Sequence, residues 1–249
     1  MSDVPLDREQ VLDKLEQLAD VEHALIVEYL TVSCALGHDL SAEEGGATSD
    51  EGRQAAGAAM GLAQGEMFHL KDICGALVDA GRTPLVGRAS SIADATGVLL
   101  TLDPPSAAQL RHVIGREKAI AGAVDAAYAG LAPALTPEVF DEPLLARLRN
   151  VVEFGAAHGE GSTRLRDALG EPPPADFLRV PRRETDNPFE QALLRTSDLA
   201  YRLVTSALRE QFAQPDVFGF RSLAFTAMDA LDSSNRALAH RGLLPAFTL

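Results

Sequence analysis

A glutamate and a histidine three residues apart lie inside a largely apolar stretch of this sequence. The stretch is GEMFHLKDICGAL, residues 65–77, and it contains Glu66 and His69. Its apolar residues recur every three or four positions, which predicts an α-helix with both polar side chains in the middle of the apolar face. Because a buried polar group must be paired or bound to be tolerated, this pair is the first candidate for a functional site.

Three further segments with helical periodicity each carry one polar residue at mid-length on an apolar face, namely Glu22, Glu117 and His158. One such acid alone is more readily explained as a solvated residue or a partner of an arginine. Three carboxylates and two imidazoles together are different, because no lysine or arginine lies on the same faces to balance them. A divalent metal ion would offset the cost of burying them. We therefore expect a metal site formed by Glu22, Glu66, His69, Glu117 and His158.

The elements that would position these residues are helices, and alternating strand patterns are scarce, so the predicted class is all-α. The helices are expected at about Leu6–Leu36, Gly52–Ala80, Ser106–Leu131, Glu142–Leu169, Pro188–Ala213 and Gly219–Arg241. Glycines at positions 81, 170 and 242 follow three of these ends, as helix stop signals do. The stop signals and the periodicity therefore agree.

The connections predict how the helices pack. Residues 81–105 link the second helix to the third and are numerous enough to run the length of a bundle. One long crossover is typical of the ferritin-like four-helix bundle, which we place at residues 1–170. Residues 171–187 are then a linker, and residues 188–249 form two C-terminal helices that dock on the bundle as an α-hairpin, giving a single compact domain.

The composition excludes several classes of partner. The chain of 249 residues has a formal net charge of −14 and no basic stripe, so nucleic acid and anionic membranes are poor partners. It lacks both an apolar run of about 18 residues and the pattern of a secretory signal. We expect a soluble, cytoplasmic protein. Cys34 and Cys74 lie in apolar helical surroundings and are expected to be buried free thiols.

These motifs also resemble a known family. The stretch VEHALIVEYL followed by GEMFHLKDICGAL looks like the first two helices of the ferritin-like superfamily. With HGEG at residues 158–161, the sequence is most similar to the ferritin-like domains of the VioB and RebD type, the iminophenyl-pyruvate dimer synthases of bisindole biosynthesis. The resemblance covers about residues 10–170. It implies that the metal ligands include Glu22, Glu66, His69 and Glu117.

The fourth helix departs from the di-metal pattern, in which two helices each supply a Glu-x-x-His step. A second step ending at His158 needs an acid at position 155, where this chain has glycine. Glu153 and Glu160 lie nearby but fall on the polar side of an ideal helix. Because GAAHGEG contains three glycines, a local distortion would turn one of them inward, so both stay as alternative ligands. The second metal is then weakly held, or the site holds one metal.

Other polar residues near these faces have simpler explanations. His23 faces a second apolar stripe and is expected to be a packed core histidine, and Glu28 falls on a mixed face and is expected to be structural. Tyr29 and Tyr128 lie on the inner faces. They either pack in the core with a satisfied hydroxyl or bond to a metal-bound oxygen or a ligand carboxylate. Both roles stay open for the two tyrosines.

Imidazole and carboxylate ligands suit iron or manganese, and a ferrous pair with an open position can bind and reduce dioxygen. We therefore expect a non-haem iron oxidoreductase, with one or two iron ions, that acts on a small organic substrate in specialised metabolism. The last two helices would form a wall of its cavity. The expected partners are the substrate and dioxygen, and a homodimer is a candidate assembly. Two alternatives stay open: a ferritin-like iron-binding or ferroxidase protein without an organic substrate, and a scaffold subunit with a degenerate metal site.

Overall fold

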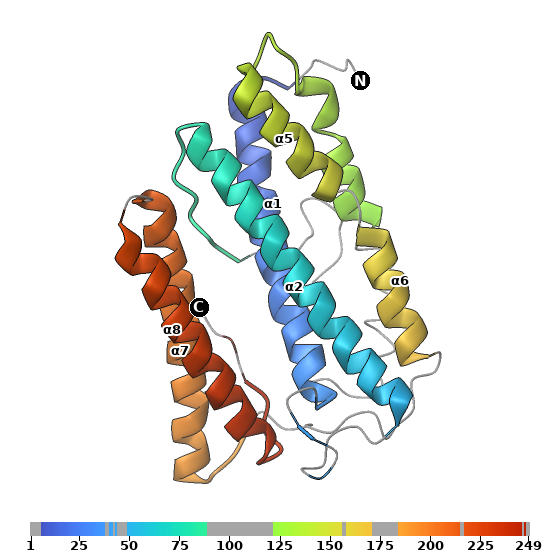
Figure 1. Ribbon diagram of the computed structural model, residues 1–249, viewed down its shortest axis with the longest axis vertical. Helices are drawn as coiled ribbons and strands as arrows, with labels where there is room; N and C mark the ends of the chain where they lie inside the picture. Colours follow the sequence, from blue (N-terminus) through green and yellow to red (C-terminus); the bar gives the residue numbers. More distant parts are fainter. Residues whose placement is uncertain are drawn as a thin grey trace.

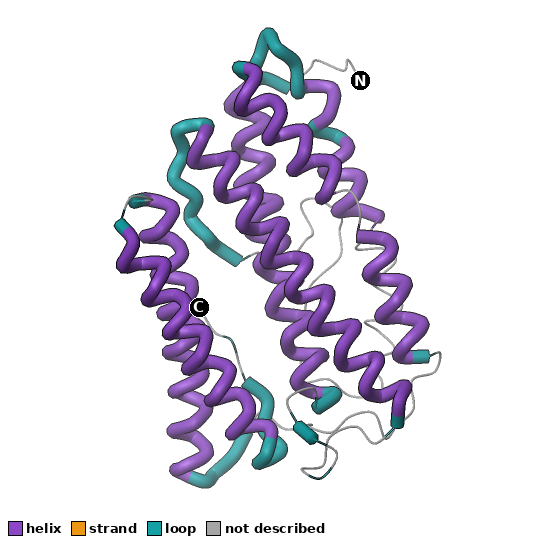
Figure 2. The backbone as a smooth tube through the Cα atoms, in the orientation of Figure 1, coloured by secondary structure: helices purple, strands orange, loops and turns teal. Residues whose placement is uncertain are grey.

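Helices make up all the regular structure in the described part of the chain. The computed structural model describes residues 6–37, 40, 41, 43, 49–88, 122–155, 158–170, 184–214, 217–245 and 247, with the backbone alone at 158–162 and 218. Within these ranges every regular element is a helix and no β-strand occurs (Figure 2). The prediction of an all-α fold is therefore confirmed for these residues. None of the helices described here is long and apolar enough to cross a membrane.

Two long helices, α1 (Arg8–Ala35) and α2 (Asp50–Asp79), form the centre of the structure. Asp7 caps α1 and Ser49 caps α2, and each side chain accepts a hydrogen bond from a backbone N–H of the first turn. After α2 the chain turns at Gly81, whose φ of 84° favours glycine. The two helices run antiparallel and pack side by side (Figure 1).

Two shorter helices, α5 (Glu142–Gly155) and α6 (His158–Leu169), pack against α2. A helical segment at residues 122–129 and a 3-10 turn at Ala132–Ala134 precede α5. The sequence predicted one helix over residues 142–169, and these two helices cover that range apart from residues 156 and 157, which lie outside the described residues. The expected distortion near the glycines of GAAHGEG therefore stays a prediction.

The C-terminal part is a helical hairpin of α7 (Pro188–Ala213) and α8 (Phe218–Ala239), which pack on each other. In Figure 1 the hairpin lies beside α1 and α2. A buried cluster of Val27, Tyr201 and Phe247 joins it to α1. The predicted boundaries of α1, α2, α7 and α8 agree with the structure to within two residues. Docking of the hairpin on the preceding helices is therefore observed.

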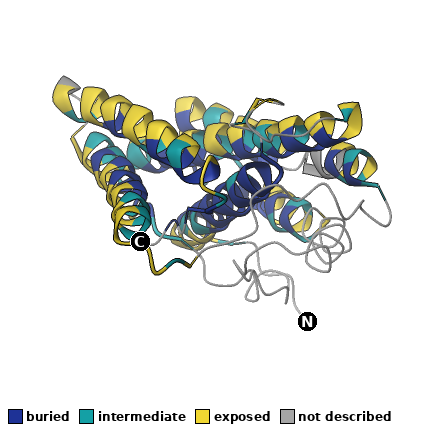
Figure 3. Ribbon diagram, turned by 90° about the horizontal axis from the view of Figure 1, so that it is seen from below, coloured by how far each residue is buried: buried dark blue, intermediate teal, exposed yellow. Residues whose placement is uncertain are grey.

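The main apolar core lies between α1, α2, the segment at 122–129 and the α5–α6 pair. Buried residues follow the inward faces of these helices (Figure 3). The core includes Leu15, Leu25, Ile73, Leu77, Tyr128, Leu145, Leu148 and Leu165. Of the predicted third helix, residues 106–121 lie outside the described residues, as do most of the predicted crossover and most of the linker. The core surrounds the polar residues that the sequence singled out on α1 and α2.

Candidate metal centre

Three predicted ligands come together between α1 and α2. Glu22 lies on α1 and Glu66 and His69 lie on α2, and each offers a ligand atom within 4.8 Å of the other two. The Nδ1 atom of His69 lies 2.9 Å from Oε2 of Glu66 and 3.7 Å from Oε2 of Glu22. Both glutamates are buried, whereas the histidine side chain is 22% exposed. The two carboxylates are therefore shielded from solvent, and solvent reaches the cluster at the side chain of His69.

The packing of apolar neighbours explains why these polar groups face one another. Leu18 and Leu25 lie one turn before and one turn after Glu22 and are buried, so the face of α1 that carries the glutamate must pack inward. On α2 the buried residues Ala63, Leu70 and Ile73 flank the Glu-x-x-His step in the same way. The spacing of three places the two groups of that step on adjacent turns of one face. The sequence pattern thus positions all three groups.

The electrostatics of the cluster reflect an excess of acid over base. Burial alone would lower the pKa of His69, but the nearby carboxylate of Glu22, the hydrogen bond to Glu66 and the negative charges of both glutamates outweigh burial and raise the pKa from 6.5 to about 9. In the metal-free protein the imidazole is therefore protonated at neutral pH. The cluster therefore places two acidic groups beside one basic group.

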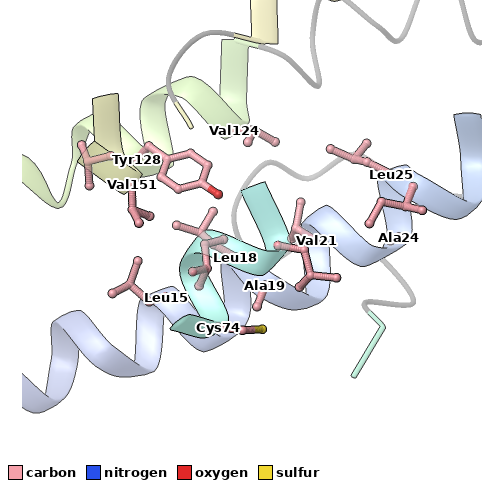
Figure 4. Close-up of a cluster of buried hydrophobic side chains, with 14 of the residues drawn as sticks. Leu15, Leu18, Ala19, Val21, Ala24, Leu25, Cys74, Val124, Tyr128 and Val151 are labelled. Carbon is pink, nitrogen blue, oxygen red and sulfur yellow. The ribbon is translucent and has the colours of Figure 1, made fainter. Parts of the chain in front are cut away.

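Tyr128 adds a hydroxyl group to the cluster from the helical segment at 122–129. Its side chain is fully buried, and the hydroxyl donates a hydrogen bond to Oε1 of Glu22. Figure 4 shows the ring extending toward α1 near Leu18 and Val21. Burial, followed by the charge of Glu22, raises the pKa of Tyr128 well above its ordinary value. The tyrosine is therefore a neutral donor; its ring packs in the core, and its hydroxyl bonds to the carboxylate of Glu22, a predicted ligand.

The glycine that the sequence analysis treated as a missing acid contacts this tyrosine. A Cβ atom at Gly155 would lie 2.4 Å from Cζ of Tyr128 and within 2.6 Å of both neighbouring ring carbons. Real Cβ atoms do not approach other atoms so closely, so the ring fills the space where a side chain at position 155 would begin. The sequence signal for this contact was present, since glycine is a poor helix residue, but the sequence could not identify the partner.

The next residue of α1, His23, belongs to a separate buried cluster. His23 is 4% exposed; its Nδ1 donates to the carbonyl oxygen of Gly87 at 2.7 Å, and its Nε2 accepts from the hydroxyl of Tyr201 at 2.6 Å. The prediction of a packed core histidine is confirmed. Because the hairpin meets α1 here, at His23 and Val27, it contacts a different face from the one that carries Glu22. The prediction that the hairpin walls a cavity at the site is not tested by these contacts and stays a prediction.

The remaining predicted residues do not join the observed cluster or cannot be placed in it. Glu117 lies outside the described residues, and for His158 and Glu160 the structure describes only the backbone, in the first turn of α6. The side chain of Glu153 is exposed on α5. Tyr29 is buried in the core of α1, two turns after Glu22. The fourth helix therefore contributes no ligand within the described part of the site.

Two smaller predictions also have clear outcomes. Glu28 is 5% exposed, so the mixed face of α1 on which it was placed is buried at this position, in agreement with the expected structural role. The physical reason is that the hairpin covers α1 near Val27, which the periodicity of α1 alone could not indicate. Cys34 and Cys74 are both buried free thiols, as expected, and burial raises the pKa of Cys74 to about 12.

The donor set of the cluster fits a divalent transition metal. Carboxylate oxygens and imidazole nitrogen are ligands that iron and manganese bind in proteins. Three groups held this close together by two packed helices can reach one ion with small side-chain movements, and the ion would replace the proton on His69. A cation would also offset the cost of burying the two carboxylates. The residues present therefore fit such a metal, although they do not by themselves select its identity.

No family model, curated protein or solved structure matches this chain. The resemblance to ferritin-like proteins therefore stays an expectation from the sequence motifs alone. What can be said of function depends on the geometry of Glu22, Glu66, His69 and Tyr128.

Proposed function

We propose that this chain is a metal-dependent oxidoreductase in which Glu22, Glu66 and His69 bind iron or manganese. The observation that carries the proposal is the convergence of two buried carboxylates and one imidazole, with ligand atoms within 4.8 Å of one another. The surrounding helices support a ferritin-like bundle, whose four members would be α1, α2, the helix that ends at residue 129 and the α5–α6 pair.

The chain's own residues would have distinct roles at this site. Glu22 and Glu66 supply two buried carboxylates. A bound divalent cation would offset the cost of removing them from water. His69 supplies the third ligand, and its partial exposure gives small molecules a route to the cluster. When bound, iron or manganese supplies one-electron redox chemistry and a binding position for dioxygen. We propose a small organic molecule as the reductant that is oxidised.

The proposal is tested first by metal content. The double variant E66Q/H69N removes two ligands with nearly isosteric side chains and should lose tightly bound iron or manganese while keeping its helical content. The matched control is E153Q/H240N, which makes the same two chemical changes at exposed positions. Elemental analysis after supply of each metal and desalting measures the difference. Equal metal content in the two double variants would refute the site.

The second measurement asks whether bound iron can take a ligand in place of dioxygen. Nitric oxide binds ferrous ions as a dioxygen analogue and gives a characteristic paramagnetic signal. We expect this signal in the iron-loaded wild type and not in E66Q/H69N. Absence of the signal from a protein that holds iron would favour a structural metal in a scaffold subunit. Rapid oxidation of free ferrous ion by a large shell-like oligomer would favour the ferroxidase alternative.

A further inference from the structure

The ring of Tyr128 fills the space that a side chain at position 155 would need. If Gly155 carried a Cβ atom, the nearest ring atom would be Cζ, the carbon that bears the hydroxyl, at 2.4 Å. Any side chain at this position would therefore displace the end of the ring that reaches Glu22. Tyr128 is fully buried, so the ring cannot move aside into solvent. An acidic residue at position 155 is therefore incompatible with the observed position of the Tyr128 hydroxyl.

The two oxygens of Glu22 consequently have different surroundings. Oε1 accepts the hydrogen bond from Tyr128, while Oε2 lies 3.7 Å from Nδ1 of His69 and faces the cluster. A carboxylate that bridges two metal ions uses both of its oxygens as ligands. At Glu22 one oxygen already accepts a hydrogen bond from the neutral hydroxyl of Tyr128, and the other lies on the side of the remaining candidate ligands.

We propose that Tyr128, seated against Gly155, is a positioning residue that commits Glu22 to a single metal ion through Oε2. The inference rests on the proposed metal site and adds its stoichiometry and the reason for it. The hydroxyl takes the place that an acid of the fourth helix would fill in a two-metal site. The glycine is then the feature that selects a one-metal site rather than a defect in a two-metal one.

The experiment is a manganese titration of the wild type, Y128F and Y201F, by equilibrium dialysis with elemental analysis. Y201F is the matched control, because it also removes a buried hydroxyl that bonds to α1, at the residue next to Glu22. We expect one ion per wild-type chain, with the paramagnetic resonance spectrum of an isolated ion. Y128F should keep this stoichiometry but bind manganese about tenfold or more weakly, as loss of a ligand's hydrogen-bond partner typically does. Y201F should bind as the wild type does.

The outcomes separate this inference from the proposed function. Two ions per wild-type chain, with the spectrum of a coupled pair, would overturn the inference and leave the metal site standing. Unchanged affinity in Y128F would also overturn it, because the hydroxyl would then have no effect on the metal. An equal loss in Y201F would overturn it as well, because both tyrosines would then act only through the general stability of α1. No manganese or iron in the wild type would overturn both. G155A gives a second variant, in which the displaced ring should reproduce the loss seen in Y128F.

Discussion

Two consecutive residues of α1 each bond to a buried tyrosine hydroxyl, yet they belong to clusters of opposite character. Glu22 accepts from Tyr128 on the side that faces α2, and His23 accepts from Tyr201 on the side that faces the hairpin. The carboxylate lies beside a second carboxylate and a protonated imidazole. The pKa of His23, by contrast, is lowered by burial, so that this imidazole is neutral.

The difference in charge and hydrogen bonding between the two clusters distinguishes a structural polar cluster from a candidate metal site. Around His23 every ring nitrogen has a partner of the right kind, since Nδ1 donates to the Gly87 carbonyl and Nε2 accepts from Tyr201. Such a neutral, satisfied network stabilises the docking of two parts of the fold. Around Glu22 two buried acidic groups meet one basic group, His69. Burial of carboxylates is costly, and a bound cation would relieve that cost.

The largest expected effect comes from removing the aromatic ring on the structural side. Tyr201→Ala deletes a ring that contacts Phe247 and Val27, and should cost about 3–5 kcal/mol of stability, as truncations of buried aromatic residues do. Denaturant unfolding measures the loss, and limited proteolysis should cut the hairpin first. If the two clusters are independent, the folded variant keeps its manganese affinity. A large loss of affinity would mean that the hairpin supports the metal site through α1.

A smaller effect is expected at the glycine beside Tyr128. Gly155→Ala introduces a Cβ into the buried ring and should cost about 1–3 kcal/mol by overpacking. The matched control is Gly75→Ala, where the new Cβ would meet only the end of the Arg147 side chain, a partly exposed group that can move away. Loss of the Arg147–Asp79 ion pair costs about 0–1 kcal/mol, which the gain in helix propensity largely offsets. Equal thermal unfolding of the two variants would contradict the close fit of ring and glycine.

These contrasts also mark how far the sequence could predict the molecule. Periodicity placed α1, α2, α7 and α8 to within two residues and aligned Glu22 with Glu66 and His69, because apolar stripes determine which face packs inward. Periodicity could not predict contacts between segments that are distant in the sequence. The pairing of Tyr201 with His23 joins residues 178 positions apart, and no local pattern encodes it. The sequence shows that Gly155 departs from the two-metal pattern, but the role of this glycine depends on the ring of Tyr128, which comes from another helical segment.

The effect that compares the two clusters most directly is the pH dependence of stability in the metal-free protein. His69 has a folded-state pKa of about 9 against an ordinary value of 6.5. Its contribution to stability is therefore complete below about pH 6.5 and is lost as the pH rises through 9. The pKa of His23 is shifted downward, so the unfolded chain binds this proton more readily. Its contribution is complete above pH 6.5 and declines as the pH falls below that value.

Denaturant unfolding across this range, compared between the wild type, H69N and H240N, measures the first of these contributions. The alkaline decline should be shallower in H69N than in the wild type, since the raised pKa is gone. H240N replaces an exposed histidine and should follow the wild type. Saturating manganese should also flatten the alkaline decline of the wild type, because a bound ion takes the place of the proton on His69. An identical decline in H69N and the wild type would contradict the shared proton and, with it, the electrostatic difference between the two sides of α1.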